Sequence, residues 1–286
     1  MTHFVFFNGS IVPQAEARLS VLDRGFLFAD GIYEFSAVLG GRLVDHEAHM
    51  ARFERSLREV QIKNPFSVEE WTRFGRELIS RNGLVEGFLY MQVTRGAPEQ
   101  RDFAFPSAST SPTSVMFTQA RNILHNPNID AGVRVITVPD LRWSRRDIKS
   151  ISMLPQVLAK QAAAEAGAFE AWLVEDGYVT EGSSSTAFLI TREHQIVTRP
   201  LSRSILPGIT RQAILRLASE RDLSIVERPF TVQEAYQAAE AFLTSATSFV
   251  LPVVAINANV VGDGRPGEKT RRLRELYLAA AHASAG

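Results

Sequence analysis

Strand-like apolar runs alternate with amphipathic helical segments along the whole chain, and this alternation limits the possible folds more than any other feature. Residues 32–39 have the composition of a strand and end at a glycine pair. Met50, Phe53 and Leu57 then recur at helical spacing and predict a helix over about 46–60, and the spacing of the apolar residues around Trp71 predicts a second helix over about 68–81. The same alternation returns after residue 133. We therefore predict an α/β (α+β) fold rather than an all-helical or all-strand one.

A segment rich in turn residues divides this alternation into two parts. Residues 122–132 hold Asn, Pro, Asp and Gly and show little periodicity. The length of 286 residues suits two medium domains and is enough to bury a large core without disulfides. We predict a smaller N-terminal domain over 1–120, an interdomain linker over 121–132 and a larger C-terminal domain over 133–286.

Composition excludes several classes of function. Thirty-one basic and 31 acidic residues give a formal net charge of zero, which argues against a nucleic-acid partner. The absence of cysteine excludes thiolate nucleophiles, Cys-ligated zinc and iron–sulfur clusters. The N-terminus has no basic region before its apolar run, so we predict no signal peptide. The uncharged stretch 241–262 is interrupted by polar residues and proline. We predict buried strands and turns there, no membrane partner and a cytoplasmic protein.

Amine chemistry in this chain is restricted to a few side chains. Lysine supplies only four of the 31 basic residues, and arginine cannot act as a nucleophilic amine at neutral pH. Lys149 follows Arg145 and Arg146 in an apolar setting. Cationic neighbours and desolvation favour the neutral amine that a Schiff-base lysine requires. A lysine beside arginines is more commonly a solvated edge charge, and this motif alone leaves both interpretations open.

Four further segments carry groups that suit an anionic, ring-containing ligand. Residues 207–210 open a predicted helix, whose N-terminus presents free N–H groups to phosphate. Residues 244–248 form a turn rich in hydroxyl groups, and Arg52 could add a bidentate contact. Glu181 could place a carboxylate against a protonated ring nitrogen. The alternatives are a helix cap, a polar turn, a surface arginine and an ordinary loop acid.

Three motifs that resemble other chemistry are better explained as structure. Residues 262–267 match the glycine pattern of dinucleotide folds, but too few residues follow for the rest of that unit, so we predict a surface turn. His46 and His49 are three apart rather than four, and no third ligand is evident, so we predict no metal site. Residues 183–185 lack the flanking glycines of a nucleophile elbow, which indicates turn hydroxyls.

Taken together, blocks along nearly the whole chain resemble the class IV aminotransferases, which are fold-type IV pyridoxal-phosphate enzymes. The likeness is greatest to the D-amino-acid aminotransferases, and the blocks occur in the family's order. They are Asp23–Gly25, Phe28–Glu34, His49–Arg52, Val93–Gly96, Arg142–Trp143, Asp147–Ser150, Val157–Gln161, Thr180–Ser185, Gly208–Arg211 and Thr244–Ser248.

The resemblance implies a role for each matching residue around pyridoxal 5′-phosphate. Lys149 matches the lysine that forms the Schiff base and moves the proton between Cα and C4′. Glu181 matches the glutamate that keeps the pyridine nitrogen protonated. The positions matching the phosphate site are Arg52, Ile209, Thr210, Ser245 and Ala246, with Thr247 beside them as a hydroxyl donor. Ala246 can contribute only its backbone N–H group.

The substrate site departs from the family at one position. Tyr33 and Arg101 match the residues that receive the substrate carboxylate. Two residues beyond Arg101, where the D-amino-acid enzymes have a histidine, this chain has Phe103, which can neither donate a hydrogen bond nor carry a charge. Carboxylate binding is then expected to depend on Arg101, with Arg24 and Arg142 as further candidates.

The resemblance also implies an architecture and a reaction. We expect two α/β domains of the fold-type IV architecture, with the cofactor at their interface, in a homodimer. The reaction implied is ping-pong transfer of an amino group from a D-amino acid, of the D-alanine or D-glutamate type, to 2-oxoglutarate or pyruvate, with the cofactor alternating with pyridoxamine 5′-phosphate. The alternatives on the same fold are an (R)-selective amine transaminase, a branched-chain L-amino-acid transaminase and an aminodeoxychorismate lyase. A cofactor-free binding protein would have lost Lys149 or Glu181.

Overall fold

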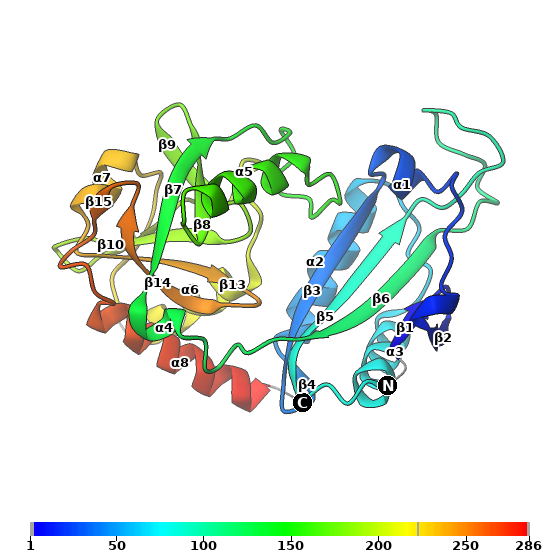
Figure 1. Cartoon of the computed structure of the whole chain (residues 1–286), viewed down its shortest axis with the longest axis horizontal. Helices are drawn as coiled ribbons and strands as arrows, with labels where there is room; N and C mark the ends of the chain where they lie inside the picture. The colour runs from blue at the N-terminus through cyan, green and yellow to red at the C-terminus, as the bar shows by residue number, and fades with distance from the viewer. Residues whose placement is uncertain (1–2, 222, 285–286) are drawn as a thin grey trace. The chain divides into compact units, whose positions relative to one another are not determined.

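The strand and helix patterns of the sequence are realised in two structural units (Figure 1). The computed structural model describes residues 3–221 and 223–284. The first unit holds the described residues up to Asn122 together with Ile148–Ser152. The second unit holds Ile123–Asp147 and Met153–Ala283. The fold is mixed α/β, as the alternation predicts.

The first unit contains one antiparallel sheet whose strand order is β2-β1-β6-β5-β3-β4. Its strands are β1 (Phe4–Phe7), β2 (Ser10–Pro13), β3 (Gly31–Leu39), β4 (Arg42–Leu43), β5 (Glu86–Thr94) and β6 (Thr113–Ala120). Short helical segments, η1 (Gln14–Glu16) and α1 (Arg24–Phe28), lie between β2 and β3. The long central strands β3, β5 and β6 pair over most of their length, which fixes which side chains share a face.

Two helices cover one face of this sheet. They are α2 (His46–Glu59) and α3 (Val68–Arg81), close to the bounds that their apolar spacing predicts. Helix α3 begins with a capping box between Ser67 and Glu70. Buried side chains of both helices, such as Phe53 and Trp71, pack with Met91 of the sheet in one hydrophobic core.

The segment that carries Lys149 belongs to the first unit. Ser150 forms an antiparallel bridge with Ile32, and the Tyr33 N–H group donates to the Lys149 carbonyl at 2.9 Å. The bounds predicted from the sequence place this lysine in the C-terminal domain. Its segment instead groups with the first unit, because its backbone pairs with the start of β3.

The second unit contains a nine-stranded mixed sheet of order β12-β11-β10-β13-β14-β7-β8-β9, with β15 paired to β14. Its strands are β7 (Val133–Pro139), β8 (Glu170–Glu175), β9 (Tyr178–Gly182), β10 (Thr186–Ile190), β11 (Ile196–Thr198), β12 (Ile225–Glu227), β13 (Glu240–Ser245), β14 (Phe249–Ile256) and β15 (Asn259–Val260). Its helices are α4 (Asn128–Ala131), α5 (Leu154–Glu165), α6 (Ile209–Ser219), α7 (Val232–Gln237) and α8 (Glu268–Ser284). Helix α4 lies within the segment predicted as a linker.

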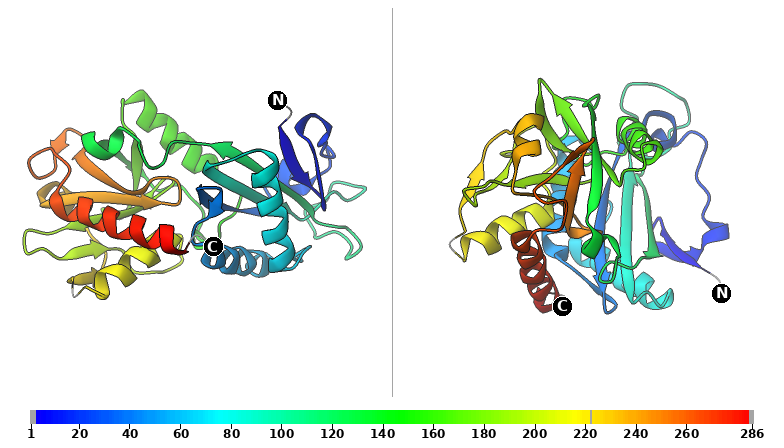
Figure 2. Two further views of the ribbon diagram at one scale, coloured as in Figure 1. Left: turned by 90° about the horizontal axis from the view of Figure 1, so that it is seen from below. Right: turned by 60° about the vertical axis from the view of Figure 1, so that its left-hand side comes forward.

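Helix α8 packs on the outside of the second unit, as two further views show (Figure 2). Tyr277 contacts the ring of Phe249, and Arg274 donates to the carbonyl oxygens of Ser248 and Val250 at 2.8 Å. The uncharged stretch 241–262 forms most of β13, β14 and β15 with their turns. Strands β13 and β14 are mostly buried, as predicted, whereas both residues of β15 are exposed. In the described part of the chain, no helix has the length and apolar character needed to cross a bilayer.

Candidate active site

Lys149 is held by its backbone while its amine lies against an aromatic ring. Its carbonyl accepts from Tyr33, and its own N–H group donates to Ser56 Oγ at 3.5 Å. The Lys149 Nζ atom lies 4.2 Å from the centroid of the Tyr33 ring. A fixed backbone and an aromatic neighbour restrict where the amine can lie, as a reactive lysine requires. By contrast, Lys160 Nζ donates to the Phe169 carbonyl.

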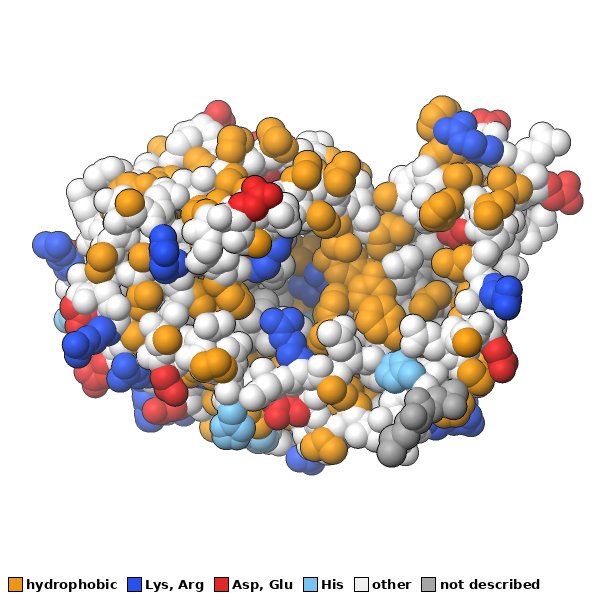
Figure 3. Space-filling view, in the orientation of Figure 1, with side chains coloured by type: hydrophobic (Ala, Val, Ile, Leu, Met, Phe, Trp, Pro, Cys, Tyr) orange, Lys and Arg blue, Asp and Glu red, His pale blue; other side chains and the backbone are white. Residues whose placement is uncertain are grey.

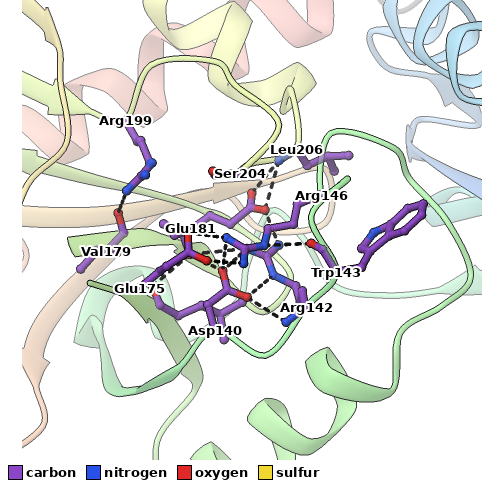
Figure 4. A network of polar contacts seen from close by, with 12 residues as sticks. Asp140, Arg142, Trp143, Arg146, Glu175, Val179, Glu181, Arg199, Ser204 and Leu206 are labelled. Atoms are coloured by element: carbon purple, nitrogen blue, oxygen red, sulfur yellow. Dashed lines mark hydrogen bonds and ion pairs between the residues drawn. The ribbon is translucent and has the colours of Figure 1, made fainter. Parts of the chain in front are cut away.

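Glu181 is a buried carboxylate near the end of β9. The pairing of β8 with β9 shifts register between Trp172 and Val174, and such a bulge re-aims the side chains beside it. Both carboxylate oxygens of Glu181 accept from the backbone N–H group of Leu206, at 3.1 and 3.2 Å. One oxygen also accepts from Arg142 Nη1 (Figure 4). The side chain is therefore fixed by two elements that lie apart in the sequence.

Arg142 is shared between Glu181 and a second carboxylate, Asp140. Its Nε and Nη2 atoms donate to Asp140 at 2.9 and 2.7 Å, and Thr180 Oγ1 donates to Asp140 at 2.7 Å. Arg146 also lies 3.2 Å from Asp140. The Asp140 side chain is wholly buried. Arg142 thus directs one nitrogen atom to Glu181 and two to Asp140.

The direction of the Glu181 pKa is decided first by burial, and the sharing of Arg142 with Asp140 adds to it. Burial raises the pKa of Glu181, the guanidinium of Arg142 lowers it in part, and Asp140 raises it further, so that the net direction is upward. A buried carboxylate whose pKa is raised is stabilised by a further positive group or hydrogen-bond donor. The protonated nitrogen of a pyridine ring is such a donor, so Glu181 fits the ring of pyridoxal phosphate.

A helix N-terminus in the same unit is open towards an anion. Gly208 precedes α6, and no side chain caps this end of the helix, so its first N–H groups are available. A Cβ atom at Gly208 would lie 2.8 Å from Thr186 Oγ1, which shows how closely the helix start approaches β10. Ile209 and Thr210 are the first two residues of the helix.

The turn between β13 and β14 lies beside this helix start. Thr186 pairs with Thr244 across β10 and β13, so the strand that approaches Gly208 leads directly into Ser245, Ala246 and Thr247. Among the described residues, Thr244 Oγ1 is buried without a hydrogen-bond partner. Ser245 Oγ accepts from the Ser248 N–H group at 3.1 Å. The structure therefore brings together five predicted phosphate ligands, and N–H and hydroxyl groups of this kind suit a phosphate.

Arg52, the sixth predicted phosphate ligand, lies in the first unit and pairs with a buried glutamate. Its Nε and Nη2 atoms donate to Glu34 at 2.9 and 2.6 Å, and His49 Nδ1 lies 3.0 Å from the same carboxylate. Burial by itself raises the pKa of Glu34, but Arg52 and His49 outweigh it and the pKa is below its ordinary value. A role of Arg52 towards phosphate remains a prediction.

Three residues predicted to bind the substrate carboxylate lie in the first unit. Tyr33 lies beside Lys149. Arg24 is buried, pairs with Asp30 at 2.7 Å, and donates to the backbone carbonyls of the loop 102–104. Arg101 is exposed just before that loop and lies 4.7 Å from the Phe28 ring. Arg24 therefore holds the loop that follows Arg101, and these contacts do not favour Arg24 itself as a carboxylate ligand.

The structure adds residues that the sequence analysis missed. Asp140 and Thr180 complete the contacts of Arg142, and Glu34 completes those of Arg52. Asp140 directly follows β7, and an acidic residue at the end of a strand is a signal that could have found it. His46, from the discounted metal motif, lies 3.0 Å from Thr72 Oγ1. No cluster of three metal-ligating side chains occurs in residues 3–221 and 223–284.

Comparison with known proteins shows which family the chain resembles over most of its length. The family model for amino-transferase class IV matches residues 31–256. D-alanine aminotransferases from Staphylococcus aureus (strain MSSA476) and Bacillus licheniformis are each 38% identical over 273 residues. The first match covers 96% of both chains and the second 94% of both.

Solved structures give the same picture of the fold. The T.th. branched-chain amino acid aminotransferase with pyridoxamine 5′-phosphate superposes with a TM-score of 0.90 at 25% identity, covering 99% of this chain and 95% of that one. The Escherichia coli branched-chain amino acid aminotransferase gives a TM-score of 0.87 at 21% identity, covering 100% and 96%.

Proposed function

The chain belongs to the class IV aminotransferases, which are pyridoxal-phosphate enzymes, and we propose that it transfers the amino group of a D-amino acid to a 2-oxo acid. The proposed donors are of the D-alanine or D-glutamate type, and the acceptor is 2-oxoglutarate or pyruvate. The names of the curated relatives, at 38% identity over 96% of the chain, support this choice of donor. The branched-chain enzymes match at lower identity, and that activity remains the main alternative.

The observation that best supports this function is the environment of Glu181. Glu181 is buried, it shares Arg142 with Asp140, and its pKa is raised. When bound, pyridoxal phosphate supplies the electron sink that stabilises a carbanion at the donor's Cα atom. Glu181 would hold a proton at the ring nitrogen, since the charged pair offsets the unfavourable burial of the carboxylate. Arg142 and the Leu206 N–H group orient this carboxylate.

Lys149 would carry the proton of the reaction on its Nζ atom. A positioned amine that accepts a proton from Cα and returns it acts as a general base and then a general acid. The backbone contacts of Lys149 with Tyr33 and Ser56 hold the amine in place for both steps. The helix start at Ile209 and Thr210 and the turn of Ser245–Thr247 would hold the phosphate, and we assign Arg52 to the same task.

We assign the substrate carboxylate to Arg101 and Tyr33. Arg101 is exposed, and the loop after it is held by Arg24. Phe103 supplies no donor, so the charge of Arg101 carries more of the binding here than in relatives with a histidine. Arg142 already directs its N–H groups to Glu181 and Asp140, which makes it a weaker candidate.

We also propose that the enzyme is a homodimer. Leu154, Val157 and Leu158 on α5 are exposed, and so are Leu141 and Trp143 in the segment before it. Several large apolar side chains exposed on neighbouring segments are typical of an interaction surface. Analytical ultracentrifugation of the wild type and of Leu158→Glu tests this, and a monomeric wild type would contradict it.

The cofactor assignment is tested by chemical labelling. Purified protein should be yellow, and borohydride reduction should fix the cofactor on Lys149. Lys149→Ala should lose the visible absorption band, whereas Lys160→Ala serves as a matched control and should keep it. A label found on another lysine would overturn the assignment.

The donor assignment is tested by a panel of D-amino acids, L-amino acids and (R)-amines, with 2-oxoglutarate or pyruvate as the acceptor. Transfer from D-alanine or D-glutamate supports the proposal. Transfer from branched-chain L-amino acids alone would favour the alternative. Release of pyruvate from aminodeoxychorismate without any acceptor would indicate a lyase.

A further inference from the structure

Three aromatic side chains cross the sheet of the first unit on the face opposite to α2 and α3. Phe35 of β3 is paired with Tyr90 of β5, and Tyr90 is paired with Phe117 of β6. Side chains directly opposite each other in a sheet project from the same face. The neighbouring register row, Glu34, Met91 and Met116, is buried on the helix side. We call Phe35, Tyr90 and Phe117 the aromatic row.

The rings of the aromatic row are in contact with one another. The centroids of Phe35 and Tyr90 are 5.1 Å apart, and those of Tyr90 and Phe117 are 4.7 Å apart. Both distances lie in the range that aromatic pairs prefer. Tyr90 Oη also donates to Gln92 at 2.7 Å. The row is therefore held in place before any ligand binds.

The aromatic row is only partly covered within its unit. All three side chains keep intermediate exposure, and none belongs to the hydrophobic core that α2 and α3 form with the sheet. Hydrophobic side chains gather on the visible face over β3, β5 and β6 (Figure 3). An aromatic surface that is fixed in place but still partly exposed is typical of the wall of a ligand-binding site.

The aromatic row begins one ring away from the reactive amine. Tyr33 stacks on Tyr90 with centroids 5.7 Å apart and an interplanar angle of 26°. Lys149 Nζ lies 4.2 Å from the centroid of Tyr33. A donor must bring its Cα atom next to this amine. A bulky substituent on Cα that extends along the sheet face past Tyr33 approaches Tyr90 and Phe35, whose ring centroids lie 5.7 and 6.0 Å from that of Tyr33. The ring of Phe117 adjoins Tyr90.

The chemistry of this face favours one kind of substituent. The row nearest Lys149 consists of Tyr33, Gln92 and Val115, and the next is the aromatic row. Neither row contains a charged side chain, so the second carboxylate of D-glutamate finds no cation in them. An aryl group finds ring faces and edges, whereas the methyl group of D-alanine is too small to reach them.

We propose that the aromatic row is a subsite for the side chain of the amino donor, and that it selects an aryl or bulky apolar group over methyl or carboxylate. This inference rests on the proposed transfer from D-amino acids, and within that reaction it changes the preferred donor from D-alanine or D-glutamate to one with a bulky apolar side chain. D-phenylalanine and arylalkyl (R)-amines are then better donors than D-alanine and D-glutamate.

The test compares kcat/KM for D-phenylalanine and D-alanine in the holoenzyme, with pyruvate or 2-oxoglutarate as the acceptor. Contacts with two rings should favour D-phenylalanine by about tenfold. Phe117→Leu keeps an apolar side chain of similar size and should reduce that ratio to within about twofold of one. The matched control is Phe88→Leu, since Phe88 contacts Phe35 at 4.8 Å but stands one row further from Lys149. It should leave the ratio unchanged.

Inhibition supplies a second measurement that does not depend on turnover of the aromatic donor. With D-alanine as the donor, 3-phenylpropionate should inhibit at about tenfold lower concentration than propionate, and Phe117→Leu should remove this difference. The subsite is overturned if the ratio of kcat/KM for D-phenylalanine to that for D-alanine is at or below one in the wild type, or is equal in Phe117→Leu and the wild type. Transfer from D-alanine would then still support the proposed function. If no D-amino acid is a donor, the proposed function fails, and tighter inhibition by 3-phenylpropionate of transfer from any other donor still identifies the subsite.

Discussion

Glu34 in the first unit and Glu181 in the second are both buried glutamates paired with an arginine, yet their pKa values move in opposite directions. Burial raises the pKa of each carboxyl group. At Glu34 the guanidinium of Arg52 and the ring of His49 outweigh this effect, and the pKa falls below its ordinary value. At Glu181 burial outweighs Arg142, and the pKa rises.

Both carboxyl groups are buried, and they differ in how many cationic contacts offset that burial. Arg52 directs both Nε and Nη2 to Glu34, and His49 adds a third contact. Arg142 gives Nε and Nη2 to Asp140 and only Nη1 to Glu181. The carboxylate of Glu34 is paired with both Arg52 and His49 and stabilises the fold. The carboxylate of Glu181 receives a single nitrogen atom of Arg142 and can therefore bind a further positively charged ligand group.

The largest effect is expected from neutralising the fully paired glutamate. Glu34→Gln leaves the buried Arg52 without its carboxylate, and breaking such a pair should cost about 3 to 5 kcal/mol of unfolding free energy at pH 7. Chemical denaturation measures this. The control Glu77→Gln removes an exposed pair with Arg81 and should cost less than about 1 kcal/mol.

The same carboxyl group predicts a pH dependence with a definite sign. Its pKa is lower in the folded state than the ordinary value of 4.5, so its stabilisation is present above that pH and is lost as the pH falls below it. The difference in stability between wild type and Glu34→Gln should therefore shrink on acidification. A difference that stays constant down to about pH 3 would contradict the pairing.

Glu181→Gln should affect the reaction rather than the fold. Loss of the carboxylate should lower kcat by at least about a hundredfold, because the ring nitrogen then loses its charged partner. Unfolding free energy should not fall as in Glu34→Gln, since a carboxyl group whose pKa is raised opposes folding when it is ionised. Near wild-type turnover would identify Glu181 as an ordinary buried acid.

Arg101 extends the comparison to an exposed arginine. Arg101→Ala should lower kcat/KM for D-amino acids by roughly ten- to a hundredfold, the effect of losing one charge-assisted hydrogen bond. An amine without a carboxylate, such as (R)-1-phenylethylamine, should be much less affected. Equal losses for both donors would give Arg101 a structural role, and no loss would move the carboxylate site elsewhere.

The smallest effect tests the sharing of Arg142 directly. Asp140 raises the pKa of Glu181, so Asp140→Asn should lower that pKa and move the acid limb of the kcat profile to lower pH, by about one pH unit or less. Glu175→Gln is the matched control, because Glu175 pairs with Arg146 rather than with Arg142. A shift to higher pH in Asp140→Asn would show that Asp140 acts mainly by orienting Arg142.

Much of the fold and the family could be predicted from local sequence. The spacing of Met50, Phe53 and Leu57 predicted α2, and the apolar spacing around Trp71 predicted α3, because helix formation depends on neighbours a few residues apart. The blocks that resemble class IV aminotransferases identified the family, which the family model and the relatives confirm. The grouping of the serine–threonine turn with the start of α6 also followed from these blocks.

Which partners these residues take was decided only by the tertiary structure. Nothing near Arg142 in the sequence predicts that it serves Glu181, or that Arg24 holds the backbone of residues 102–104. Lys149 joins the first unit because its backbone pairs with β3, a contact between segments far apart in the chain. The aromatic row likewise exists only through the register of three strands. The sequence determines local conformation and the chemistry available, whereas burial and long-range pairing decide which charges are satisfied and which remain available for a ligand.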